Sequence, residues 1–80
     1  MTITNKTEAL TAINTYGEGK TYTVSFRIGD FWHNNIVIAD SMENIKTAYS
    51  KYGETIITAV ENPNTVRYEI MAKGKPVCIV

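Results

Sequence analysis

The residues of this chain that could carry nucleophilic or metal chemistry are few. His33 is the only histidine and Cys78 the only cysteine among 80 residues. A zinc site generally uses three or four close protein ligands, and a Cys–His nucleophile needs a third group that orients the base. One histidine with dispersed carboxylates supplies neither, and Cys78 in the apolar segment 76–80 is typical of a small core residue. We therefore expect no metal, no cofactor and no enzymatic activity.

A Gly-Lys-Thr triplet at residues 19–21 matches the end of a phosphate-binding loop. That motif needs a further glycine five positions before Gly19, where this chain has Asn14, and a helix directly after the loop. The order expected here is helix, loop, strand, so no helix N-terminus would face a phosphate. The triplet therefore does not indicate nucleotide binding.

The most unusual local composition is an aromatic and amide-rich segment, Phe31, Trp32, His33, Asn34 and Asn35. Aromatic side chains such as Trp and Tyr are enriched at the energetic centres of protein interfaces, so an exposed loop at this place would anchor a partner protein. The alternative is that Phe31 or Trp32 closes one end of the core, because large aromatic side chains in small domains serve packing. We predict these five residues as the binding site for a protein partner.

The charge balance disfavours nucleic acid as that partner. Eight basic and eight acidic residues give a formal net charge of zero and are scattered along the chain. Binding to DNA needs a dense positive surface, and base stacking on Tyr22 and Phe26 would need basic residues beside them. A small nucleic-acid-binding protein is therefore an alternative of lower rank. Low net charge favours association, which leaves a homodimer with a ligand or enzyme site between its subunits as another alternative.

Two segments carry the signals that begin and end helices. Asn5 with Glu8 opens the first, and Asp40-Ser41 with Glu43 opens the second. Gly17 and Gly53 stand where these helices would end. The signals predict helices over residues 6–16 and 41–52.

Alternation of apolar and polar residues predicts a strand over residues 20–28. Turn formers follow at Gly29-Asp30 and at residues 34–35. A turn at the first pair places Trp32 in the second strand of a hairpin, and a turn at the second pair places it in the first strand. Further strands are predicted over residues 36–39, 55–60, 65–72 and 77–80. If the last strand lies at a sheet edge, its open backbone groups would invite pairing with another chain.

These elements predict a single α+β domain over residues 1–80, in the order α-β-β-α-β-β-β. The expected sheet is mainly antiparallel, with both helices packed on one face. No apolar run approaches the roughly 20 residues of a membrane span, and the first residues do not have the pattern of a signal peptide. The sequence therefore predicts a soluble cytoplasmic protein.

In its size, neutrality, lack of catalytic residues and mixed α and β order, the chain resembles the small accessory proteins of bacteriophages and mobile elements. Anti-CRISPR proteins are among them. The resemblance rests on features of the whole chain and transfers no site residue. It implies a non-enzymatic protein-binding module that inhibits a bacterial defence complex by covering one of its surfaces.

Overall fold

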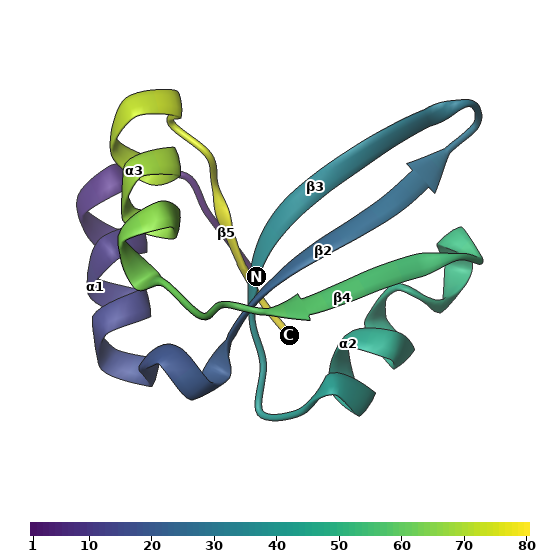
Figure 1. Cartoon of the computed structure of the whole chain (residues 1–80), viewed down its shortest axis with the longest axis horizontal. Helices are drawn as coiled ribbons and strands as arrows, with labels where there is room; N and C mark the ends of the chain where they lie inside the picture. Colours follow the sequence, from purple (N-terminus) through teal and green to yellow (C-terminus); the bar gives the residue numbers. More distant parts are fainter.

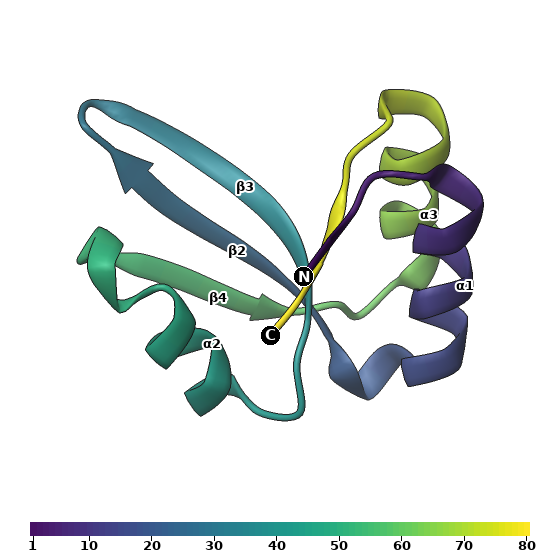
Figure 2. The same cartoon turned by 180° about the vertical axis from the view of Figure 1, so that it is seen from behind.

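The computed structural model describes the backbone of residues 1–80 and every side chain except that of Glu18. Figures 1 and 2 show it from opposite sides. The elements in chain order are β1 (Thr2–Ile3), α1 (Lys6–Tyr16), β2 (Thr21–Ile28), β3 (Phe31–Ile38), α2 (Met42–Ala48), β4 (Thr55–Ala59), α3 (Pro63–Lys73) and β5 (Val77–Ile79). Short 3-10 turns, η1 (Glu18–Lys20) and η2 (Ser50–Tyr52), follow α1 and α2. The predicted α+β class is confirmed, but the predicted order missed β1 and took α3 for a strand.

The five strands form one mixed sheet in the order β1-β5-β3-β2-β4. Three of the four neighbouring pairs are antiparallel, and only β3 and β5 run parallel. The strand predicted at the C-terminus exists, but it lies between β1 and β3 rather than at an edge. The condition on which pairing through residues 77–80 depended, a place at the sheet edge, is therefore not met, and the edge strand opposite β1 is β4.

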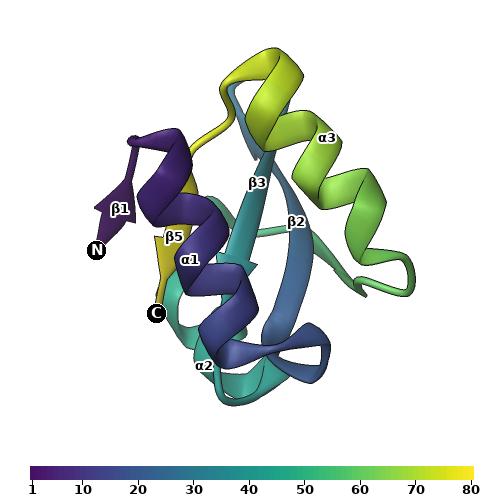
Figure 3. The ribbon, with the colours of Figure 1, turned by 90° about the vertical axis from the view of Figure 1, so that its left-hand side faces the viewer.

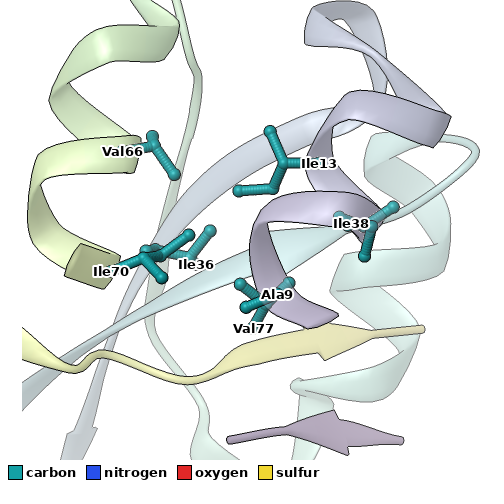
Figure 4. Close-up of a cluster of buried hydrophobic side chains, with 8 residues drawn as sticks. Ala9, Ile13, Ile36, Ile38, Val66, Ile70 and Val77 are labelled. Carbon is teal, nitrogen blue, oxygen red and sulfur yellow. The ribbon is translucent and has the colours of Figure 1, made fainter. Parts of the chain in front are cut away.

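Helices cover both faces of this sheet, so the expectation of two helices on one face is wrong. Figure 3 shows α1 and α3 in front of the sheet and α2 behind it. Ile13 of α1 and Ile70 of α3 pack with Ile36 of β3 in one core cluster (Figure 4). Ile45 of α2 belongs to a second cluster that contains Val37 of the same strand. The reason is the run at residues 36–39, which is apolar on both faces and needs a cover on each.

Helix α3 replaces the strand predicted over residues 65–72. Asn62 caps its first turn, accepting a hydrogen bond from the Asn64 N–H at 3.0 Å, and Pro63 occupies the first helical position. Gly74 ends the helix in the left-handed conformation, with φ 67°. Val66 and Ile70 lie four residues apart and are buried, whereas Tyr68 between them is 62% exposed. The helical spacing of these side chains therefore prevails over their alternation.

The hairpin between β2 and β3 has a two-residue turn at Gly29-Asp30. Ile28 faces Phe31 across the turn, and Arg27 faces Trp32. Gly29 has φ 62°, which a glycine adopts without steric cost. Of the two turns compatible with the sequence, the first is observed, and Trp32 lies in the second strand of the hairpin.

Candidate functional site

The β2–β3 hairpin is held just behind its tip by an aromatic cluster on the α2 side of the sheet. The Phe26 ring lies 5.6 Å from the His33 ring and 4.7 Å from the Tyr52 ring, measured between centroids. Tyr49 also contacts Phe26, at 5.2 Å, and its hydroxyl accepts a hydrogen bond of 3.0 Å from the Asn35 amide. These contacts join both strands of the hairpin to the end of α2 and to η2, so the part of the hairpin next to its tip is a fixed support.

The Tyr49 hydroxyl has a perturbed acidity. Burial raises the pKa of its hydroxyl, and the hydrogen bond with Asn35 opposes that rise in part. The hydroxyl is therefore neutral at physiological pH. Its place in the cluster is structural, as a packed ring with a satisfied polar end.

Beyond this support, the tip of the hairpin presents three large apolar side chains to solvent. Phe31 is 75% exposed, Ile28 is 51% exposed and Trp32 is 45% exposed. Figures 1 and 2 show the tip projecting away from α1 and α3. We call Ile28, Phe31 and Trp32 the tip surface. Ile28 and Phe31 face each other across the turn on the α2 side of the hairpin, and Trp32 lies next to them on the other side. Single exposed apolar residues are ordinary, but three of them gathered around the end of one projecting hairpin indicate an interaction site.

A charged pair lies beside the tip surface. The Arg27 guanidinium carbon lies 5.8 Å from the centroid of the Trp32 ring, and an Arg27 nitrogen lies 3.8 Å from an Asp30 carboxylate oxygen. The Asp30 side chain is almost fully exposed. The Arg27 guanidinium thus packs against one face of the Trp32 indole and places a positive charge at the rim of the tip.

The five residues predicted as one binding loop belong to a strand and therefore divide between two faces. His33 stacks on Phe26 and Asn35 bonds to Tyr49, so these two side chains, with Phe31, lie on the α2 side. Trp32 contacts Arg27 on the opposite side, where Asn34 accepts a hydrogen bond from the Ser25 hydroxyl. Only Phe31 and Trp32 retain large exposed apolar surface. The idea of a loop tip formed by residues 31–35 is corrected to a tip surface that includes Ile28.

The sequence interpretation missed Ile28 because its alternation places it with Tyr22, Val24 and Phe26 on the buried face. In the structure that face is covered only as far as Phe26, and Ile28 lies beyond the aromatic cluster. The turn signal at Gly29-Asp30 would have revealed this, because a residue beside a hairpin turn lies at the end of the sheet.

The open backbone edge of β3 adds a second feature to the same site. β5 pairs with Ile36, Val37 and Ile38 only, so residues 31–35 have no strand on that side. The Val80 N–H donates to the Ile38 carbonyl at 3.0 Å, which shows that even-numbered residues of β3 direct their backbone groups toward β5. By the same alternation, Trp32 and Asn34 direct theirs toward open space.

The other groups considered for chemistry do not assemble. Cys78 pairs with Val37, four residues along β3 from His33, which places the two about 13 Å apart at strand spacing. In the described part of the chain, no three His, Cys, Asp or Glu side chains gather as metal ligands would. Within the Gly-Lys-Thr triplet, Lys20 pairs with Asp40 at 2.9 Å, and Thr21 is buried with its hydroxyl bonded to the Gly17 carbonyl. The helix–loop–strand order expected around the triplet is confirmed.

None of the helices in the described chain is long and apolar enough to span a bilayer. No protein-family model matches the chain, and neither does any curated protein or solved structure.

Proposed function

We propose that this protein is a non-enzymatic binding module that attaches to a partner protein through the tip surface of its β2–β3 hairpin. The observation that carries the proposal is the exposure of Phe31, Ile28 and Trp32 at the end of a hairpin that is fixed by packing just behind its tip. Aromatic residues with Arg beside them are the side chains that most often dominate binding energy at interfaces.

The fixed support behind the tip makes this surface a favourable anchor. Association costs free energy when side chains and loops must become ordered, and a strand pair held by Phe26, Tyr49 and Tyr52 is already ordered. The open backbone groups of Trp32 and Asn34 add directional hydrogen bonds, which a partner could satisfy by lying along β3. Both features support recognition by surface contact without chemistry.

The proposed target is a component of a bacterial defence complex, blocked because this protein covers one of its surfaces. Support for this part comes from the resemblance to small accessory proteins of bacteriophages and mobile elements. A small neutral chain of 80 residues fits that mode of action. The target class and the binding surface are separate parts of the proposal and fail separately.

The binding surface is tested by comparing Phe31→Ala with Tyr68→Ala. Tyr68 lies on α3 and is 62% exposed, so both variants remove an exposed ring. The immobilised wild-type protein is expected to capture a discrete protein from a bacterial lysate, the Tyr68→Ala protein to capture the same one, and the Phe31→Ala protein to lose it. Equal capture by both variants would reject the tip surface.

The target class is tested in bacteria that carry an active CRISPR system, by measuring phage plating with the protein expressed. Restored plating with the wild-type and Tyr68→Ala proteins, but not with Phe31→Ala, is the expected result. Unchanged plating with all three proteins would reject a CRISPR target. It would not contradict the capture of a partner protein in the lysate experiment.

A further inference from the structure

The edge strand β4 lacks the devices that usually protect a sheet edge. Its sequence from Thr55 to Ala59 contains no charged residue and no proline, although natural proteins commonly place either at an open edge. Ile56 is 53% exposed, and Thr58 and Ala59 are also exposed. β4 lies at the far side of the sheet from β5, separated from β3 by β2, so it is a surface distinct from the open edge beside Trp32.

The backbone groups of β4 that face outward can be identified. The Val60 N–H donates to the Thr21 carbonyl at 3.1 Å, and Thr58 and Ile56 continue the same alternation toward β2. Thr55, Ile57 and Ala59 therefore direct their N–H and C=O groups away from the sheet. Among the described residues, no backbone hydrogen bond from a turn, loop or helix cap involves Thr55, Ile57 or Ala59.

Acidic side chains mark both ends of this edge. Glu54 precedes β4 and Glu61 follows it, both are exposed, and the ion pairs formed by the described side chains include neither. Beside the Glu61 end lies a hollow of about 330 Å³, lined by Thr58, Thr65 and Glu69 as well as Glu61. The Glu69 carboxylate is paired with Lys75 at 2.8 Å, so among the described side chains Glu61 supplies the unpaired negative charge of this hollow. A long basic side chain fits the size and the charge of this hollow.

We propose that the β4 edge accepts an extended segment of a partner protein that has an uncharged β-branched centre and a Lys or Arg at each end. The centre would pair with the outward backbone groups of Thr55, Ile57 and Ala59 and cover Ile56. The basic ends would meet Glu54 and Glu61, one of them entering the hollow. The proposal is independent of the tip surface.

A second copy of this chain fits the edge less well. An antiparallel pairing that uses all three outward residues is centred on Ile57. At both ends Glu54 of one copy then faces Val60 of the other, one residue from Glu61, so two carboxylates come close together. Like charges placed side by side oppose pairing. The charge pattern therefore selects a basic partner.

The test uses two seven-residue peptides with a Thr-Val-Thr-Val-Thr centre, one with Lys at both ends and one with Glu. The amide protons of Thr55, Ile57 and Ala59 are followed by NMR during titration. The Lys-ended peptide is expected to bind about tenfold more tightly or better, and to slow hydrogen exchange at these amides. Equal affinity of the two peptides, or unchanged amides, would overturn the proposal.

The decisive variant is Ala59→Pro, with Ala59→Ser as its matched control. Proline removes an outward N–H and is tolerated on an edge strand. The Ala59→Pro variant is expected to bind the Lys-ended peptide about tenfold less tightly or worse, whereas Ala59→Ser and Trp32→Ala leave that affinity unchanged. Equal binding by Ala59→Pro and Ala59→Ser would refute edge pairing.

Two further measurements keep the test decisive. If Ala59→Pro does not fold, Glu61→Gln replaces it. This variant must lower the affinity for the Lys-ended peptide and must not lower the affinity for the Glu-ended peptide. Sedimentation of the wild-type protein alone is expected to give a monomer. If the wild-type protein is instead a dimer, and Ala59→Pro dissociates it, the edge belongs to a second copy and the proposed partner is overturned. Ile56→Lys serves the same purpose if Ala59→Pro does not fold.

Discussion

Phe26 and Phe31 lie in the same hairpin and differ sharply in exposure, which makes them a matched pair for mutation. Phe26 is 6% exposed within the aromatic cluster, and Phe31 is 75% exposed at the tip. Phe26→Ala leaves a cavity among packed rings and should cost about 3–5 kcal/mol of unfolding free energy. Phe31 buries only a quarter of a side chain of roughly 200 Å², so Phe31→Ala should cost about 1 kcal/mol or less.

Urea unfolding followed by far-UV circular dichroism measures both costs. With a slope of about 1 kcal/mol per molar urea for a small domain, the midpoint should fall by about 3 M or more for Phe26→Ala and by no more than about 1 M for Phe31→Ala. The wild-type slope should be retained in the Phe31→Ala protein. Equal losses for the two variants would show that Phe31 is a core residue, and the tip surface would lose its basis.

Three other predictions concern the elements that support this site. Gly74→Ala should cost about 1 kcal/mol in urea unfolding because Gly74 has φ 67°, whereas Gly19→Ala, with open space around it and no positive φ, should be nearly neutral. Asn62→Ala should cost about 1 kcal/mol through loss of the α3 cap. Burial holds the folded Tyr49 hydroxyl protonated, so stability should fall as the pH rises above about 10, where the unfolded hydroxyl ionises, and Tyr49→Phe should reduce that fall.

The sequence predicted α1 and the hairpin strand β2 well because their signals agree with one another. Asn5 caps α1 as expected, accepting the Glu8 N–H at 3.0 Å, and the helix ends at Tyr16 before Gly17. The strand predicted over residues 20–28 is observed as Thr21–Ile28. In both segments local propensity, apolar spacing and end signals point to the same structure.

Helix α3 could not be distinguished from a strand by spacing alone. Its buried side chains are only Val66 and Ile70, and two apolar residues four apart satisfy both a period of two and a helical repeat. The signals at its ends were the better guide, because Asn62-Pro63 opens a helix and Gly74 closes one. The prediction of a strand over residues 65–72 left these end signals out of account.

Only part of the candidate site could be predicted from the sequence, because the exposure of a side chain depends on where the elements that cover it end. The segment 31–35 does contain the exposed Phe31 and Trp32, yet His33 and Asn35 are tied to the aromatic cluster. Which residues α2 covers depends on contacts distant in sequence, such as that between Tyr49 and Phe26. Strand β1 could not be predicted from local sequence for a similar reason. Its two residues form a strand only because they pair with β5 at the other end of the chain.

Photocrosslinking inside bacterial cells tests the central claim most directly. Phe31→p-benzoylphenylalanine places the reactive group on the tip surface, and Tyr68→p-benzoylphenylalanine places it at a similarly exposed position on α3. The account predicts a discrete covalent adduct with one protein from position 31 and none with that protein from position 68. No adduct from position 31, or the same adduct from both positions, would contradict it.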